Sequence, residues 1–320
     1  DWTMAPGAPT GVSAVAASEQ ATVTFTAPTF AGIPGTITGF KVTSSEGETA
    51  TGSSSPITVT GLTNDTAHTF TVQAQNAIGL GAFSSASSSV TPSNPRCVFM
   101  GGDSASDSSN VIDFIQVLTT GNASDFGDLT ERKRGLAGSG SSTRGLSNGG
   151  NVYNVGQTNR IEYITIASAG NGTDFGDMTS NRRDLGAASN STRSLAIGGA
   201  NTNVIDYVTI ASTGNATDFG DCESSPQEEI GCTANSTRAV IAGDNDTKIS
   251  YVTIASTGNA AEFGNRTEAN NLIGACASST RAVFAGGEQS STNKIDYVEI
   301  GSLGNAVDFG DLVTTSNAGT

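Results

Sequence analysis

Residues 203–221 read NVIDYVTIASTGNATDFGD, and close variants of this stretch occur throughout the second two-thirds of the chain. Ile205, Asp206 and Tyr207 stand in succession near its start, and twelve residues after the tyrosine stands Phe219 of an Asp-Phe-Gly triplet. Its first nine residues are too apolar for a sheet with one face in water, which indicates a strand covered on both faces. The stretch therefore decides the fold of the region in which it recurs.

Three landmarks of this repeat occur five times each. The first is an arginine followed five residues later by a glycine pair or its remnant, at Arg96, Arg144, Arg193, Arg238 and Arg281. The second is Ile, usually an acid, and an aromatic, the aromatics being Phe114, Tyr163, Tyr207, Tyr251 and Tyr297. The third is the phenylalanine twelve residues further on, at Phe126, Phe175, Phe219, Phe263 and Phe309. Only the connection from the glycine to the isoleucine varies in length, which predicts one loop per repeat on an open face.

Each repeat holds room for four strands, including one through Leu185–Ala188 and one that ends near the Asp-Phe-Gly. Four-stranded units with both faces covered by their neighbours are typical of β-propeller blades, and nothing in the region follows the 3.6-residue period of helices. We therefore predict an all-β chain with a propeller over residues 96–320. The first repeat lacks the strand that precedes Arg144 and its equivalents, so we also expect the ring to stay open within these 320 residues. Its closure would then need either residues beyond 320 or a partner that fills the gap.

The repeat resembles the kelch repeat. Both have a glycine pair that ends a strand, a variable loop, a tyrosine in the next strand and an aromatic about a dozen residues later. Phenylalanine stands where kelch has tryptophan, and Asp244 replaces the second glycine of the fourth repeat. The amino-acid sequence of residues 203–221 also resembles repeats of virion-attached proteins of tailed bacteriophages. This resemblance extends over residues 96–312. This second resemblance implies a fibre-type appendage and localisation in the virion, and it implies no particular activity.

Residues 1–90 have a different pattern, with short alternating runs such as Ala21–Thr26 and Thr69–Ala74 that predict about seven half-buried strands. Their order resembles a fibronectin type III module over about residues 6–93, through the Pro9–Ala14 opening, Gly61-Leu62, and Asn76–Gly79 with the serine-rich strand after it. Phe25 stands where that family usually has a tryptophan, and His68 stands where it has a corner tyrosine, so the corner hydrogen bond is in doubt. Residues 91–95 contain two prolines and suit a stiff linker.

The net charge of −15 argues against nucleic acid as a partner, and no apolar run is long enough to insert in a membrane. The four cysteines lack metal-ligand spacing, so we expect free, buried thiols, with a Cys222–Cys232 disulfide as an alternative. We predict no cofactor.

No catalytic or metal site is predicted. The only histidine, His68, lies outside the repeats, which excludes a Ser-His-Asp triad there. Paired carboxylates stay open as an alternative, because many acids follow residue 95 and no spacing selects two of them. We interpret the Asp-Phe-Gly triplets as structural, with a packed aromatic and a glycine turn. We also expect each repeated arginine to pair with a repeated aspartate of the next blade, the Asn-X-Ser/Thr triplets to be turns, and Asp244–Asp246 to be an acidic turn.

A binding rim is predicted on the variable loops, since equivalent loops of successive blades emerge on one face. Polar, amide-rich loops with an exposed aromatic suit sugar recognition. The residues expected to line this rim are Asp103, Asp107, Tyr153, Asn154, Gln157, Asn201, Asn245, Glu288 and Gln289.

The function expected from these features is a virion structural protein of the tail-fibre or head-fibre type. Other virion proteins would contact the N-terminal module, and a host surface glycan or protein would contact the propeller. The protein is also a candidate for homo-oligomer formation. The alternative is a secreted or cell-surface adhesin of a bacterium that binds carbohydrate.

Overall fold

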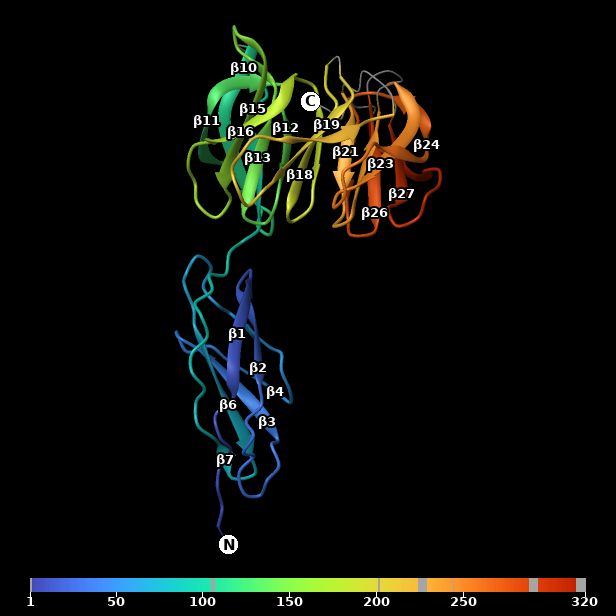
Figure 1. The fold of residues 1–320 in the computed structure, drawn as a ribbon. Coiled ribbons are helices and arrows are strands. Elements are labelled where there is room, and N and C mark those ends of the chain that lie inside the picture. Colours follow the sequence, from blue (N-terminus) through green and yellow to red (C-terminus); the bar gives the residue numbers. More distant parts are fainter. Residues whose placement is uncertain are drawn as a thin grey trace. The chain divides into compact units, whose positions relative to one another are not determined.

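The computed structural model describes residues 2–104, 107–200, 202–223, 229–243, 245–287 and 293–314. The regular secondary structure of these residues is all β-strand (Figure 1). The chain forms two compact units, one of residues 1–97 with 116–122 and one of residues 98–115 with 123–320. Within the described ranges, no helix is long and apolar enough to cross a membrane.

The first unit is a sandwich of two antiparallel sheets. One sheet has the order β1 (Thr10–Ala17), β2 (Gln20–Thr26), β5 (Ile57–Thr60). The other has the order β4 (Thr49–Gly52), β3 (Gly39–Ser44), β6 (Phe70–Asn76), β7 (Gly79–Leu80). Alternate residues of β2, β3 and β6 are buried, as the period-two pattern predicts, and their side chains form one core shared by the two sheets.

The structure tests two expectations for this unit: the doubtful corner hydrogen bond at His68 and the serine-rich strand. Buried His68 keeps the corner hydrogen bond, since its Nε2 lies 3.1 Å from the Thr63 carbonyl oxygen, which accepts the bond. The prediction that the serine-rich segment forms a regular strand was wrong. Its backbone bonds β6 only at every third residue, and the hydroxyl oxygens of Ser84 and Ser87 accept from the N–H groups of Val72 and Phe70.

The second unit is a series of antiparallel sheets, and in the third to fifth sheets each strand pairs with the next along the chain. The first sheet contains β8 (Arg96–Met100), β10 (Asp107–Gln116) and β11 (Ser124–Arg134), with β9 (Asp103–Ser104) paired to β10. The second contains β12 (Ala137–Gly140), β13 (Arg144–Asn148), β15 (Gly156–Thr165) and β16 (Thr173–Arg182). The short strand β14 (Asn151–Val152) pairs with both β11 and β15, and so joins these two into a nine-stranded sheet.

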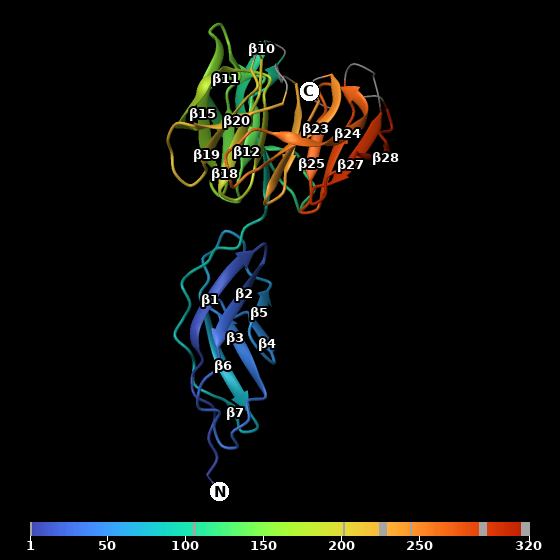
Figure 2. The same cartoon turned by 45° about the vertical axis from the view of Figure 1, so that its right-hand side comes forward.

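Three further four-stranded sheets follow. The third contains β17 (Gly186–Ser189), β18 (Arg193–Ile197), β19 (Val204–Thr209) and β20 (Thr217–Asp221). The fourth contains β21 (Gly231–Ala234), β22 (Arg238–Ala242), β23 (Asp246–Thr253) and β24 (Ala261–Asn270). The fifth contains β25 (Gly274–Ala277), β26 (Arg281–Ala285), β27 (Lys294–Glu299) and β28 (Val307–Asp311). The first strands of the second to fifth sheets, β12, β17, β21 and β25, contact one another in succession (Figures 1 and 2).

The apolar core of this unit lies between successive sheets. The cluster around Leu195 and Ile241, for example, joins side chains of the third and fourth sheets. The landmark phenylalanines of the first four sheets are only 2–3% exposed, and each contacts the landmark aromatic of its own sheet edge to face, as Phe219 does with Tyr207 at 5.9 Å between ring centroids. Burial on both faces of each sheet agrees with the apolar composition of these strands.

The glycine of the Asp-Phe-Gly triplet lies at a β-bulge inside its strand, so the expected turn was wrong. At Gly220 the backbone has a φ of 144°, and an added Cβ would lie 2.5 Å from the carbonyl of Gly258 in the next sheet. The next sheet's turn is held by Gly258 N–H, which donates to the Phe219 carbonyl, and by Asn259 Oδ1, which accepts from Asp221 N–H. Equivalent bonds occur at every junction from the first sheet to the fifth. Glycine is required here because the two backbones touch.

The two ends of the series lack such a neighbour among the described residues. The landmark Phe309 is 57% exposed, and a Cβ on Gly310 would meet nothing within 4 Å. At the other end β8 is an edge strand with Phe99 54% exposed, whereas β13, β18, β22 and β26 are paired on both sides.

All four cysteines are free, as expected. Cys222 is buried and Cys232 is half-buried, and burial raises the pKa of the Cys232 thiol well above its ordinary value. Cys97 and Cys276 are exposed, so their predicted burial was wrong. Both lie in the sheets at the two ends of the series, where a neighbouring sheet would cover them.

Candidate binding rim

The residues predicted to form the rim have different outcomes. Asp103, Tyr153, Asn154 and Asn245 are exposed, and Gln157 is half-buried. Asp107 begins β10, and its side chain lies outside the described structure. Asn201, Glu288 and Gln289 lie outside the described residues.

The variable connection of the second sheet is a β-hairpin. Asn151 and Val152 of β14 pair with Gln157 and Gly156, and Asn154 at the tip has a φ of 59°, in the left-handed region that asparagine tolerates. The tip carries Tyr153, 39% exposed, and Val155, 81% exposed. An aromatic and a branched aliphatic side chain are therefore held in water on a structured turn.

Tyr153 is fixed from below by the end of β11. The Arg132 guanidinium lies 4.6 Å from the centroid of the Tyr153 ring, and the Arg132 carbonyl accepts from the Tyr153 N–H at 3.0 Å. Arg132 Nε also donates to the Ser108 carbonyl of β10 at 2.8 Å. Because β11 pairs with β10 on one side and β14 on the other, it brings the variable connections of the first and second sheets together.

Asp103 joins the same group through Arg134, whose Nη1 lies 3.4 Å from its Oδ1 in an exposed ion pair. We call Asp103, Arg132, Arg134, Tyr153, Asn154 and Val155 the rim cluster. The two arginines and Val155 were not predicted. The run Arg132-Lys133-Arg134 could have indicated them, since alternation along a strand puts its first and third residues on one face. No contact joins Asn245 to this group among the residues described.

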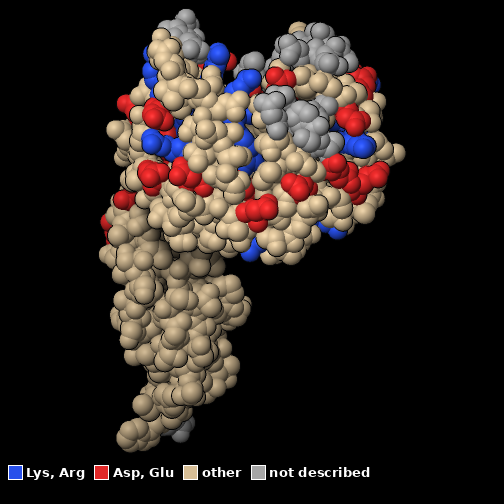
Figure 3. All heavy atoms as spheres, turned by 45° about the horizontal axis from the view of Figure 1, so that its top comes forward, with Lys and Arg blue, Asp and Glu red and all other residues tan. Residues whose placement is uncertain are grey.

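Charged side chains elsewhere on the second unit are mixed in sign, while the visible face of the first unit is almost free of them (Figure 3). The sequence accounts for this difference, because residues 1–95 contain Lys41 as their single basic residue.

Among the residues that the structure describes, three ion pairs are buried between successive sheets and have a structural role. Lys133 Nζ of β11 lies 2.7 Å from Glu162 Oε2 of β15, and Arg182 of β16 pairs with Asp206 of β19. The third pair joins Arg266 Nε of β24 to Asp296 Oδ2 of β27 at 3.4 Å. All six side chains are at most 1% exposed. Each acid is the middle residue of an Ile-acid-aromatic landmark, and each cation comes from the preceding sheet.

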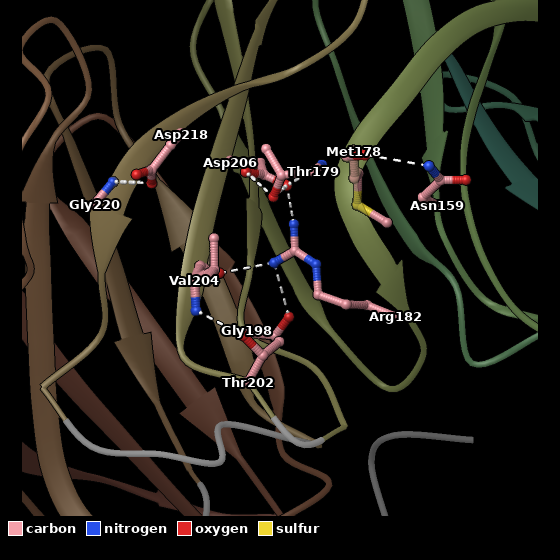
Figure 4. A network of polar contacts seen from close by, with 10 residues as sticks. All are labelled: Asn159, Met178, Thr179, Arg182, Gly198, Thr202, Val204, Asp206, Asp218 and Gly220. Carbon is pink, nitrogen blue, oxygen red and sulfur yellow. Dashed lines mark hydrogen bonds and ion pairs between the residues drawn. The ribbon is translucent and has the colours of Figure 1, made fainter.

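The Arg182 pair shows how such charges are accommodated (Figure 4). Arg182 Nη1 donates to the carbonyls of Gly198 and Val204 at 3.1 and 2.7 Å, and the Thr179 N–H and hydroxyl donate to Asp206 at 2.9–3.0 Å. Burial lowers the pKa of the Arg182 guanidinium against the opposing effect of Asp206. The partners of Arg182 Nη1 and of the Asp206 carboxylate all belong to the protein, so these charges bind the two sheets together.

In the Lys133–Glu162 pair, burial and the charge of the partner also have opposite effects on each pKa. Burial lowers the pKa of Lys133 although Glu162 opposes this effect. Burial alone would raise the pKa of Glu162, but Lys133 and two hydrogen bonds from Thr130 lower it below its ordinary value. The carboxylate of Glu162 therefore stays ionised inside the protein.

The repeated arginines do contact the next sheet, but their predicted aspartate partners were wrong. Arg193 Nη1 donates to the Ile254 carbonyl at 2.9 Å while its guanidinium stacks 4.6 Å from the ring centroid of Tyr207. Arg144 and Arg238 make the same two contacts. Arg281, in the last sheet, pairs with Glu299 of its own sheet instead.

The asparagine turns behave as predicted at Asn190 and Asn235, whose side-chain oxygens accept from the N–H groups two and three residues later.

A small cavity with a volume of about 150 Å³ lies beside the starts of β12, β17, β21 and β25. Backbone hydrogen bonds cross it from sheet to sheet, because Asp184, Glu229 and Leu272 each donate to the carbonyl of the equivalent residue one sheet earlier, starting at Gly135. All four have a positive φ of 49–58°. The floor is apolar, formed by Leu136, Leu185, Ile230 and Ile273.

No group of three or more metal-ligating side chains occurs in the parts of the chain that the structure describes. The first unit is an antiparallel sandwich with a corner hydrogen bond between His68 and Thr63, and the second is a series of stacked antiparallel sheets, so the chain is an all-β protein. Residues 7–91 match the fibronectin type III domain, and the chain thus carries this domain at its N-terminus. A comparison with curated proteins finds no match.

Proposed function

We propose that the second unit is a kelch-like β-propeller of five visible repeats and that the protein is a non-enzymatic attachment protein of the virion, of the tail-fibre or head-fibre type. The propeller is supported by four-stranded sheets with buried faces, by cores between successive sheets, and by inner strands that contact in order. The assignment to the virion is supported by the resemblance of the repeat sequence to repeats of virion-attached bacteriophage proteins.

The rim cluster carries the attachment part of this proposal. An exposed aromatic that is stacked on an arginine and held by a paired hairpin loses little conformational freedom on binding. Such a ring offers one apolar face, while Asn154 and Asp103 offer hydrogen-bonding groups beside it. This combination suits a sugar ring, and it leads us to a host-surface glycan as the ligand class.

The N-terminal fibronectin type III domain would serve as a spacer or as the docking domain toward other virion proteins. The alternative function is a secreted or cell-surface adhesin of a bacterium that binds carbohydrate through the same rim cluster. Mass spectrometry of purified virus particles separates the two, because only the first requires the protein to be part of the particle.

The test of attachment is the variant Tyr153→Ala combined with Val155→Ser, assayed for binding to host cells and to a glycan array. We expect binding to fall at least about tenfold, as for the loss of a central aromatic contact. The matched control combines Phe309→Ala with Val313→Ser, which removes an exposed aromatic and an exposed valine elsewhere on the same unit. Equal binding by the folded rim variant and the parent protein would refute the role of the rim cluster.

A further inference from the structure

One end of the first unit carries a cluster of exposed apolar side chains. It is the end at which β6 stops and β7 lies, and residues 2–7 run along it (Figures 1 and 2). The large apolar residues at this end are between 39% and 86% exposed, and we call them the apolar end: Trp2, Met4, Phe30, Ile33, Ile78, Leu80 and Phe83. Of the large apolar side chains that are exposed in residues 2–95, only Val15 lies elsewhere.

A buried asparagine fixes the backbone of the apolar end. Asn76 is 2% exposed, and its Nδ2 donates to the carbonyls of Met4 and Ala31 at 2.9 and 3.3 Å. Its Oδ1 accepts from the Ile78 N–H at 3.0 Å. Met4 and Ile33 also exchange two backbone hydrogen bonds of 3.0 and 2.8 Å. The exposed side chains therefore project from three segments that are already held together, so little backbone freedom is lost when they bind.

The acidic side chains of the first unit lie away from the apolar end. The charged residues of the described range 2–95 are Glu19, Lys41, Glu46, Glu48 and Asp65. The four acids lie in the connections that precede β2, β4 and β6, and Lys41 lies in the middle of β3. Because β4 and β6 both run toward the apolar end, their preceding connections lie at the opposite end of the sandwich. Glu19 lies there too, since its N–H donates to Asn64 in the connection before β6.

The size of the apolar end is sufficient for a stable protein interface. With about 200 Å² for a whole large side chain, its residues expose roughly 700 Å² of apolar surface. Each partner in a stable interface buries about 800 Å². Apolar patches on single proteins rarely exceed a few hundred Å², and larger ones mark sites of association.

The charge of the protein favours a second copy of this chain as the occupant. The net charge is −15, so two copies repel each other wherever their acids come close. At the apolar end they can meet without bringing carboxylates together. A partner that is recognised by its charge would need charged side chains on this surface, and residues 2–7, 27–38 and 76–83 contain none. The same surface on both copies gives a closed twofold contact.

We propose that two copies of the chain associate through their apolar ends in a twofold-symmetric dimer. Burial of the exposed apolar side chains drives the association, and the rings of Phe30 and Phe83 supply much of the contact area. The proposal concerns the first unit alone, and it depends neither on the rim cluster nor on its glycan.

The test measures the mass and the contact surface of the whole chain together. Sedimentation equilibrium gives the mass, and fluorescence reports on the apolar end, because Trp2 is the only tryptophan of the protein. We expect the mass to change from one chain to two as the concentration rises to about 10–100 µM. Over the same range the Trp2 emission should move to shorter wavelength and become less accessible to acrylamide. Added salt should strengthen the dimer, because it screens the repulsion between the acidic copies.

The disrupting variant combines Ile78→Ser with Phe83→Ser. Both side chains are exposed, at 48% and 59%, so the variant should fold and keep the melting temperature of the parent. We expect its dimer to be at least about tenfold weaker, as for the loss of central apolar contacts. Val15→Ser is the matched control, since it removes an exposed aliphatic side chain from β1 of the same unit, and it should dimerise like the parent.

Four results would overturn the proposal. The first is the mass of a single chain at every concentration. The second is a dimer that forms without a change in Trp2 emission or that persists in the folded double variant, which would place the contact on another surface. The third is equal weakening of the dimer by Val15→Ser and by the double variant. The fourth is an association that weakens with salt, which would identify a contact between charged groups.

Discussion

Arg182 of β16 donates a hydrogen bond to Asp206 of β19, and both side chains are completely buried, so an ion pair that water does not reach joins the second sheet to the third. The pair is surrounded by carbonyls and by Thr179, which satisfy most of the remaining hydrogen-bonding groups. A charge in this position is tolerated only while its partner is present.

The first prediction concerns that dependence. Arg182→Met should destabilise the second unit by about 3–5 kcal/mol, because it leaves Asp206 buried without a cation. All five tyrosines lie after residue 150, so their fluorescence during urea unfolding reports on the second unit. The double variant Arg182→Met, Asp206→Leu should recover most of the loss. If the double variant is no more stable than the single one, the charge argument fails.

The second prediction concerns pH. In Glu162→Gln, Lys133 stays buried without its carboxylate, and its already lowered pKa falls further. The unfolded chain keeps that lysine protonated up to about pH 10.4, so it binds more protons than the folded chain above the folded pKa, and stability rises with pH in that range. The melting temperature of this variant should therefore rise relative to that of the parent as the pH increases from the folded pKa of Lys133 toward about pH 10.

At low pH the stability of the parent protein depends on Glu162 and not on Lys133. The pKa of Glu162 is lowered in the folded state, so its contribution is present above its ordinary pKa and is lost as pH falls through the folded value. Lys133→Met in the Glu162→Gln background removes both titrations and serves as the control. Parallel melting curves for this control and for Glu162→Gln across the alkaline range would contradict the prediction.

The third prediction compares two phenylalanines of the same landmark. Phe219 is 2% exposed between the third and fourth sheets, while Phe309 is 57% exposed at the end of the series. Phe219→Ala should cost about 3–5 kcal/mol because it opens a cavity. Phe309→Ala should cost less than about 1 kcal/mol, since much of its ring already contacts water. Urea midpoints of the two variants give the comparison, and equal losses would show that position in the series does not matter.

The fourth prediction separates backbone strain from packing at the bulge glycines. Gly220 and Gly310 have φ values of 144° and 142°, so alanine meets the same backbone strain at both. Only at Gly220 would the added Cβ press against the Gly258 carbonyl. Gly220→Ala should therefore be less stable than Gly310→Ala by about 1–3 kcal/mol, the usual cost of overpacking. Thermal melting of the two variants measures the difference directly.

Much of this architecture follows from sequence periodicity. The alternating runs predict the strands of the first unit. The constant spacing from Tyr207 to Phe219 predicts a segment of fixed length, and the structure adds that the two rings pack edge to face. These predictions succeed because burial of alternate residues leaves a direct pattern in the sequence.

The failures concern contacts between segments that are far apart in the chain. Arg193 donates to the Ile254 carbonyl, and Asp206 forms its ion pair with Arg182. The spacing of Arg193 and Asp206 in the sequence indicates neither contact. Backbone carbonyls are present at every residue and so leave no trace in composition. The same reason explains why Arg132 was not assigned to the rim, since its contact with Tyr153 depends on the pairing of β11 with β14.

The junction between successive sheets is built from the same few parts each time: a bulge glycine, a phenylalanine carbonyl and the asparagine of the following turn. A change in repeat number would therefore keep these backbone and asparagine contacts at every remaining junction. It would not always keep the buried ion pairs, because deletion of the third repeat sets Arg182 against Ser250, which stands where the third repeat has Asp206. Such an array can change its length in steps of one repeat during evolution most readily where the two joined faces carry matching charges.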